Sequence, residues 1–324
     1  MKRTHLLAVF FITVTFSSFS QTYPLKLCSF NIQWLGSSKV RDDADLADLL
    51  KDQDIVVVQE VIAPPYAGTF PDGTPYKPAP RVAHFFDQMT NHGFSYALSE
   101  EDTGAGSTIH NNGSATELWV AFYKPQWIKI ASNLPSGFLA NDRSQNPDYD
   151  RVPYAFAFRT ADRKLDFVLI SVHLCPGSGL LDKQRRKHEL GSIASWINGH
   201  NQTEKDFIIL GDMNIENAAE LGNATPAGFH SLNEHCLPTN TNVNGPKPFD
   251  HVMYNVAFTR NEIDQAFGFH PVNLIEAMRP RWKARTTSHY PGDPPYDHNK
   301  FRAHYSDHDP VQFRMAPLAG GDDD

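Results

Sequence analysis

The sequence predicts an α/β fold in which mixed β-sheets are stacked on one another and helices lie outside them. Short apolar runs recur along the chain and outnumber the helical patterns. Several of these runs are not followed by a helix, which argues against a fully parallel, doubly wound sheet. The 324 residues are 40% hydrophobic and 20% charged, a composition that excludes disorder, collagen and coiled coil.

Six apolar runs are predicted to form strands. Four of them, 25–30, 54–59, 167–172 and 207–210, are almost continuously apolar, as strands buried on both faces are. The other two runs, 117–123 and 154–158, alternate along their length, as strands with one buried face do.

Helical patterns are fewer, and they occur at 43–50, 81–91 and 182–198. In the last of these, Leu190, Ile193, Trp196 and Ile197 share one face. These segments are the predicted outer layers.

Residues 1–20 have the pattern of a secretory signal peptide. Lys2 and Arg3 precede an apolar run over 6–16, and small residues at Ser18 and Ser20 are placed for cleavage before Gln21. The mature protein is therefore expected to be secreted, either to the outside of the cell or into a periplasm. Removal of Lys2 and Arg3 changes the formal net charge from −8 to −10.

Residues 21–316 are predicted to form one domain, followed by a disordered tail over 317–324. A cut in the proline-rich stretch 63–80 would leave an N-terminal fragment too small for its own core. No second long apolar run exists, so we expect no stable membrane association and a monomer. Cys28 and Cys175 lie on apolar runs and are expected to be buried thiols.

The negative net charge disfavours a tight nucleic-acid binder with a broad basic surface. A local basic and aromatic strip does occur within 279–290. It consists of Arg279, Arg281, Lys283, Arg285, His289 and Tyr290. Two interpretations stay open at this point: a solvated loop, slightly preferred, and a contact to nucleic acid.

Polar residues stand at the ends of the predicted strands and beside a last apolar run. They are Asn31, Glu60, His173, Asp212, Asn214, Asp250 and the pair Asp307 and His308. Any one of them could be a turn residue. Together they predict one rim at which several strand ends converge.

These residue types suit phosphodiester hydrolysis. Carboxylate and amide oxygens are ligands for a hard divalent cation. Imidazoles can donate and accept protons near neutral pH, and a carboxylate behind each imidazole fixes its tautomer. Amides and a guanidinium can bind phosphoryl oxygens.

Six motifs follow one another along the chain. They are Ser-Phe-Asn-Ile-Gln (29–33), Val-Val-Gln-Glu (57–60), Ile-Ser-Val-His-Leu (170–174), Ile-Leu-Gly-Asp-Met-Asn (209–214), Phe-Asp-His-Val (249–252) and Ser-Asp-His-Asp-Pro-Val (306–311). In this order they resemble the endonuclease/exonuclease/phosphatase superfamily, and within it the DNase I-like secreted nucleases. The resemblance implies a four-layer sandwich of two central mixed β-sheets flanked by helices. It also implies Mg²⁺ or Mn²⁺ at the rim. Two interpretations of Asp148 and Asp150 stay open: a structural Ca²⁺ site, as DNase I-like enzymes have in nearby loops, and ordinary turn residues.

The resemblance and the chemistry together assign roles to these residues. Glu60 and Asp307 hold the metal ion, with Asn31 and Asp212 near it. His308, oriented by Asp250, and His173, paired with Glu117, are the base and the acid, and their roles could be exchanged. Arg151 and Asn214 bind phosphoryl oxygens, and Asp212 orients the nucleophile or the phosphate.

The predicted function is that of a secreted, metal-dependent endonuclease of low specificity that cleaves DNA, or RNA, to leave 5′-phosphate ends. One alternative is a secreted sphingomyelinase-like phosphodiesterase, which would need an apolar element that faces a membrane. Another is a binding protein that has lost catalysis, although every catalytic position is filled.

Overall fold

The structure is a computed structural model that describes residues 24–37, 40–104, 109–110 and 116–316. The predicted signal peptide at 1–20 and the tail at 317–324 lie outside these residues, so both stay predictions. No helix within the described ranges is long and apolar enough to span a bilayer.

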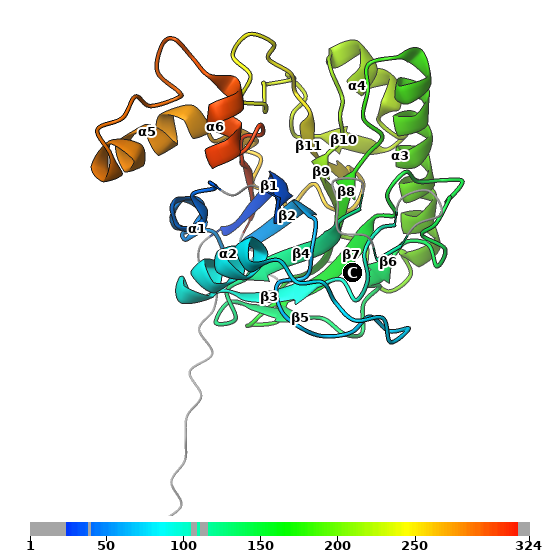
Figure 1. The fold of residues 1–324 in the computed structure, drawn as a ribbon. Helices are drawn as coiled ribbons and strands as arrows, with labels where there is room; N and C mark the ends of the chain where they lie inside the picture. Colours follow the sequence, from blue (N-terminus) through cyan, green and yellow to red (C-terminus); the bar gives the residue numbers. More distant parts are fainter. Residues whose placement is uncertain (1–23, 38–39, 105–108, 111–115, 317–324) are drawn as a thin grey trace, which may run out of the picture.

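Two mixed β-sheets form the centre of the fold (Figure 1). The first has the order β12-β13-β1-β2-β4-β3, and its strands are β1 (Leu25–Leu35), β2 (Ile55–Val61), β3 (Ser95–Leu98), β4 (Leu118–Tyr123), β12 (His270–Pro271) and β13 (Val311–Met315). The second has the order β10-β11-β9-β8-β7-β5, with β6 paired to β7. Its strands are β5 (Ile128–Ile130), β6 (Gly137–Phe138), β7 (Tyr154–Thr160), β8 (Asp166–His173), β9 (Phe207–Asp212), β10 (Phe229–Ser231) and β11 (Asp250–Asn255).

Helices cover the outer face of each sheet, as the two sides of Figure 1 show. The first sheet is covered by α1 (Asp43–Leu50), α2 (Pro80–Asn91), α5 (Leu274–Arg285) and α6 (His298–His304). The second is covered by α3 (Leu180–His200) and α4 (Ala218–Ala224). The order of layers is helix, sheet, sheet, helix, which confirms the predicted four-layer sandwich.

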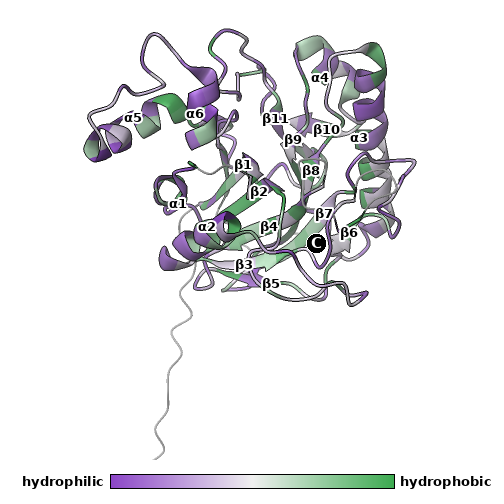
Figure 2. Ribbon diagram, viewed as in Figure 1, coloured by the Kyte–Doolittle hydropathy of each residue, from purple (hydrophilic) through white to green (hydrophobic). Residues whose placement is uncertain are grey.

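Three apolar clusters hold the layers together. One lies between the two sheets and includes Trp119, Phe158 and Leu210. The other two lie between each sheet and its helices. In Figure 2 the central strands are accordingly the most hydrophobic part of the ribbon, and α3 and the outer loops are largely hydrophilic.

The predicted strands and helices are confirmed in place, with two differences in burial and extent. β4 and β7 are buried on both faces, whereas their alternation predicted one buried face. The small residues of these strands, such as Ala121 between the sheets and Ala155 beneath the helices, also lie in apolar clusters. β1 continues past Asn31 to Leu35, with a shift of register against β2.

The solvated-loop interpretation of the basic strip is wrong for Arg279 to Arg285, because these residues belong to helix α5 (Leu274–Arg285). The contact to nucleic acid stays a prediction. The apolar side chains Leu274, Met278 and Trp282 of this helix are buried at helical spacing. Its cations face carboxylates: Arg279 and Lys283 lie on Asp293, Arg281 on Asp48, and Arg285 on Asp42 and Asp45. Tyr290 is buried and donates to the carbonyl of Ile275.

The three cysteines are free thiols, and Cys28 and Cys175 are buried as predicted. Burial raises the pKa of Cys28 above its usual range, and it raises that of Cys175 to about 12. Neither thiol is therefore a nucleophile at neutral pH.

Gly211 is required where β8 and β9 run side by side. Its φ is +139°, and a Cβ there would lie 2.1 Å from the carbonyl oxygen of Val172. Because Asp212 follows directly, this close approach of the two strands also positions the end of β9.

We predict that Gly211→Ala lowers the free energy of unfolding by about 3 kcal/mol or more, through backbone strain and a clash that the sheet cannot relieve. Gly191→Ala is the matched control, because it lies within α3 with open space around it and should raise stability by about 0.5–1 kcal/mol. Urea unfolding followed by circular dichroism measures both. A Gly211→Ala protein as stable as the wild type would refute the requirement.

Candidate active site

The second sheet brings three candidate residues into line. β8 and β9 are parallel, and His173 pairs in register with Asp212 at their ends. β11 runs antiparallel to β9, so that its first residue, Asp250, pairs with Asp212. The strand order alone therefore places an imidazole and two carboxylates side by side.

The first sheet brings the remaining strand ends to the same rim. β1 and β2 run parallel in continuous register up to the pair Asn31 and Gln59, and Glu60 follows directly. β13 runs antiparallel to β1 and pairs Val311 with Ser29, which places the preceding Asp307 and His308 beyond Asn31. The rim predicted from strand ends is thus formed by both sheets.

Asn31 joins the two sheets at this rim. Its Nδ2 donates to Glu60 Oε1 and to Asp212 Oδ2, both at 3.0 Å. Its main-chain carbonyl accepts from the Ser306 hydroxyl at 2.7 Å, and that hydroxyl also accepts from the backbone N–H of His308 at 3.0 Å. Asn31 therefore fixes the carboxylates relative to the segment that carries His308.

His173 is held by Glu117, as the resemblance implied. Its Nδ1 lies 3.0 Å from Glu117 Oε1, and the Nε of Arg151 lies 3.3 Å from the same oxygen. Burial and Arg151 would lower the pKa of His173, but the Glu117 and Asp212 carboxylates outweigh them and raise it. Burial would raise the pKa of Glu117, but His173 and Arg151 bring it below its ordinary value.

His308 is held by Asp250 in the same way. Its Nδ1 lies 2.8 Å from Asp250 Oδ2, and both side chains are buried. Burial opposes the charged form, but Asp250 and Asp212 outweigh it and raise the pKa of His308 well above its ordinary value. Each imidazole therefore has a fixed orientation and a carboxylate that stabilises its protonated form.

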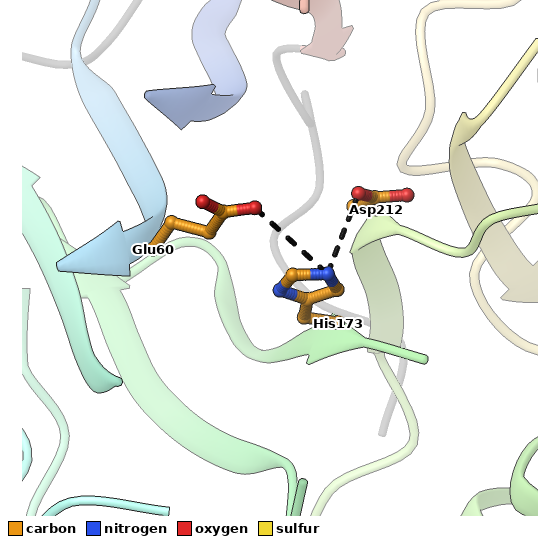
Figure 3. Close-up of side chains that lie close together, drawn as sticks. All are labelled: Glu60, His173 and Asp212. Carbon is orange, nitrogen blue, oxygen red and sulfur yellow. Dashed lines mark ion pairs between the residues drawn. The ribbon is translucent and has the colours of Figure 1, made fainter. Parts of the chain in front are cut away.

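Both imidazoles point their second nitrogen at one carboxylate. The Nε2 of His173 lies 3.6 Å from Asp212 Oδ2, and the Nε2 of His308 lies 3.5 Å from the same oxygen. Figure 3 shows the His173 ring between Glu60 and Asp212, with dashed lines from one ring nitrogen to both carboxylates. Two proton-carrying groups thus converge on one point at the rim.

Glu60 is aimed by a local irregularity of β2. It adopts a φ of +64°, and the pairing of β2 with β4 shifts register between Val58 and Val61. Its backbone N–H donates to Glu117 Oε2 at 2.6 Å. A left-handed residue within a strand is unfavourable and persists only where its surroundings hold it, as Glu117 does here.

The rim fits a divalent cation. Glu60, His173 and Asp212 offer ligand atoms within 4.8 Å of one another. Burial, with the nearby Glu117 and Asp307 carboxylates, raises the pKa of Glu60 although His173 and Asn31 oppose the shift, so a bound cation would further stabilise its charged form. Asp307, the other predicted metal ligand, lies outside this group. Its Oδ2 accepts a hydrogen bond from Gln33 Nε2 at 2.8 Å, and its buried Oδ1 has no hydrogen-bond partner among the described residues. Oxygen donors of this kind suit Mg²⁺ or Mn²⁺.

Asn214 and Arg151, the two residues predicted to bind phosphoryl oxygens, both contact carboxylates of the site. The backbone N–H of Asn214 donates to Asp212 Oδ1 at 2.9 Å, and its Nδ2 donates to the Leu174 carbonyl at 3.0 Å. Arg151 lies against Glu117 through its Nε. Each residue lies on a carboxylate that contacts His173, Asn214 on Asp212 and Arg151 on Glu117, and the contact of both with phosphoryl oxygens stays a prediction.

Helix α3 fixes the segment that follows His173. Arg186 Nη1 donates to the carbonyls of Cys175 and Gly177 at 2.9 and 2.8 Å, and its Nε donates to Glu220 at 2.7 Å. Glu189 accepts from the Cys175 N–H at 2.9 Å. These buried contacts keep the chain rigid directly after the imidazole.

The candidate Ca²⁺ residues are engaged elsewhere. Asp148 lies 2.9 Å from His188, and Asp150 lies 3.0 Å from Arg185. Neither carboxylate belongs to a group of potential metal ligands within the described ranges. The geometry lends a structural Ca²⁺ at this position no support.

Two residues of the site were missed from the sequence although they lie within quoted motifs. Gln33 ends Ser-Phe-Asn-Ile-Gln and donates to Asp307, and Ser306 opens Ser-Asp-His-Asp-Pro-Val and links His308 to Asn31. Arg41 was also missed. Its buried guanidinium donates to the carbonyls of Ile32, Gln33 and Tyr305, and no motif contains it.

Comparison with protein families decides the relationship. The model of the endonuclease/exonuclease/phosphatase family matches residues 28–308. The chain belongs to this family. Its members include endonucleases, exonucleases and phosphatases, which hydrolyse phosphoesters and typically depend on a divalent metal ion. The search of curated protein sequences found no match.

Solved structures share the fold of this endonuclease/exonuclease/phosphatase family member. A family protein from Bacteroides thetaiotaomicron is 15% identical, with a TM-score of 0.57, over 92% of this chain and 100% of its own. A mannosyl-6-phosphatase from the same species is 15% identical, with a TM-score of 0.56, over 90% and 99%. The catalytic domain of human nocturnin is 14% identical, with a TM-score of 0.53, over 91% and 95%. These likenesses show the fold alone.

The two carboxylates behind the imidazoles give a testable pH dependence. Asp250→Asn removes a charge that raises the pKa of His308, and Glu117→Gln removes one that raises the pKa of His173. A general acid sets the alkaline limb of the pH–rate profile and a general base sets the acid limb. We predict that each variant moves one limb to lower pH, that the two variants move opposite limbs, and that kcat falls by about 10²–10⁴-fold.

The measurement is kcat against pH on a chromogenic phosphodiester. Glu234→Gln is the control, because Glu234 is an exposed carboxylate beside His230 and His235 and should leave both limbs in place. Two variants that move the same limb, or neither, would contradict the assignment of one imidazole as acid and the other as base.

Proposed function

We propose that this chain is an exported, metal-dependent phosphodiesterase that cleaves nucleic acid internally, with DNA as its main substrate and RNA as a second one, to leave 5′-phosphate ends. The observation that carries the proposal is the convergence of the two carboxylate-backed imidazoles on Asp212 Oδ2, at 3.6 and 3.5 Å, directly beside Glu60. The export part rests on the sequence pattern of residues 1–20.

Two imidazoles at one point suit a reaction that moves two protons. Hydrolysis of a phosphodiester needs a base to take a proton from the attacking water and an acid to protonate the leaving oxygen. His173 and His308 can supply both groups, since each has its Nδ1 bound to a carboxylate and its Nε2 directed at the rim. Asp212 lies between them, where it can orient the attacking water.

A divalent ion held by Glu60, Asp212 and Asp307, with Asn31 beside them, would offset negative charge on the phosphoryl group and help to ionise the attacking water. In this proposal Arg151, beside Glu117, and Asn214, beside Asp212, bind phosphoryl oxygens, and their nearness to the site supports it. The acidity of the chain is compatible with a nucleic-acid substrate because several of its carboxylates form this site.

A sphingomyelinase-like activity is the second candidate, and one observation favours it. Leu180 and Leu181 are the first two residues of α3, and they are 72% and 77% exposed. They follow His173 closely in the chain, after the segment that Arg186 and Glu189 hold in place. Adjacent exposed leucines could enter a lipid surface. The candidate that has lost catalysis is the weakest, because each imidazole retains its carboxylate partner.

The substrate class is tested with the purified mature protein and Mg²⁺ or Mn²⁺ on plasmid DNA, RNA, sphingomyelin and mannose 6-phosphate in parallel. We expect cleavage of nucleic acid, with ends that a ligase accepts directly because they carry a 5′-phosphate. Cleavage of sphingomyelin or of the sugar phosphate without cleavage of nucleic acid would overturn the proposal.

We predict that His308→Ala lowers kcat on DNA by about 10²–10⁴-fold, since it removes one proton-carrying group, while the unfolding midpoint shows that the fold is kept. His235→Ala, an exposed histidine, is the control. Hydrolysis by His308→Ala at the wild-type rate would remove His308 from the mechanism.

Exhaustive treatment with a chelator should abolish activity, and Mg²⁺ or Mn²⁺ should restore it. Glu60→Gln should need a higher metal concentration for half-maximal activity, because it removes a charged oxygen ligand. Full activity of the wild-type protein after complete metal removal would contradict the role of the metal.

A further inference from the structure

A cleft of about 470 Å³ lies beside the candidate active site, between the end of β1 and helix α6. Figure 1 shows α6 next to this end of the strand. The cleft is lined by Gln33, Trp34, Ser37, Arg41, Arg302 and neighbouring residues of α6. Its volume lies within the range of small-ligand sites, and nothing in the proposed chemistry uses it.

Trp34 is the unexpected member of this cleft. Its φ is +48°, a left-handed conformation that is unfavourable for a bulky side chain, and the residue is 40% exposed. Neither backbone preference nor burial accounts for a tryptophan at this position. Strained residues of this kind cluster where ligands bind.

The main chain of Trp34 is tied to the candidate metal site. Its backbone N–H donates to Glu60 Oε2 at 2.8 Å, and the preceding Gln33, also left-handed, donates from its side chain to Asp307. The backbone that carries the exposed tryptophan is thereby held beside two predicted metal ligands. A group stacked on its ring would lie next to the candidate active site.

Positive charge accompanies the ring. Arg302 lines the cleft, is about one-third exposed and lies 3.7 Å from Asp307 Oδ2. The buried Arg41 lies at the same cleft. An aromatic face with a guanidinium beside it is the combination that holds a base and its phosphate in proteins that bind single strands.

We propose that this cleft receives one unstacked nucleobase next to the scissile phosphate, stacked on Trp34, with the adjoining phosphate on Arg302. A base within a duplex is already stacked on both faces, so it can reach Trp34 only after leaving the helix. The enzyme therefore prefers single-stranded over double-stranded nucleic acid. This inference rests on the proposed function and names the form of its substrate.

The kinetic test compares Trp34→Ala and Trp34→Phe with the wild type on a single-stranded oligonucleotide, its duplex and an abasic oligonucleotide that has the same backbone and no bases. Stacking on one aromatic ring corresponds to a factor of about 5–150 in affinity. We expect Trp34→Ala to raise KM for the single strand by about 10-fold and Trp34→Phe to keep most of the affinity. The loss on the abasic strand, which has no ring to stack on Trp34, should be much smaller.

Lys300→Gln is the matched control for charge, since it removes one cation from α6 outside the cleft. It should leave the preference for single strands in place, whereas Arg302→Gln should weaken it. Equal loss on all three substrates with Trp34→Ala would show a general disturbance of the site and overturn the proposal. So would an unchanged ratio of single-strand to duplex cleavage.

A binding measurement separates this inference from the proposed function. In a His308→Ala background with chelator present, a single-stranded oligonucleotide should quench tryptophan fluorescence, and Trp34→Phe in the same background should remove most of that quenching. Quenching by mannose 6-phosphate and not by the oligonucleotide would overturn the inference. If the wild-type enzyme cleaves nucleic acid but no quenching depends on Trp34, the base-binding role of the cleft is refuted and the proposed function stands. If the wild-type enzyme hydrolyses only the chromogenic diester, the proposed function is refuted.

Discussion

The site depends on the contacts of one group, the carboxylate of Asp212. It lies within 3.6 Å of both candidate catalytic imidazoles and accepts from Asn31, which belongs to the other sheet. A buried carboxylate is stable only where it is paired and hydrogen-bonded, so the two sheets must meet in one arrangement for these contacts to form. The packing of the sandwich and the geometry of the site are therefore one constraint.

Much of the site could be predicted from the sequence because its residues follow from strand ends. A run of buried residues that stops at His173 or Asp212 shows where parallel strands reach the rim, and parallel neighbours bring such ends together. The sequence could not show how Glu60 is aimed, because its left-handed backbone arises from a register shift held by Glu117, which is distant in the chain. The same holds for Trp34, whose exposure results from irregular backbone.

The sequence predicts the positions of strands and helices better than it predicts which charged side chains are free to bind a ligand. The cations of α5 look like a binding strip in the sequence, but partners such as Asp48 and Asp293 come from other segments. Leu274, Met278 and Trp282 have helical spacing in the sequence. Charged residues and Pro280 stand between them, and these residues are not typical of a buried helix face. Net charge and local composition thus say little about which cations stay available.

The central claim is that the Asp212 carboxylate stabilises the protonated forms of both imidazoles at once. The direct test is to titrate His173 and His308 in the metal-free protein by ¹⁵N NMR, in the wild type and in Asp212→Asn. Asp212 raises the pKa of each imidazole, so removing its charge should lower both pKa values together. A fall in only one of the two, or in neither, would contradict the account.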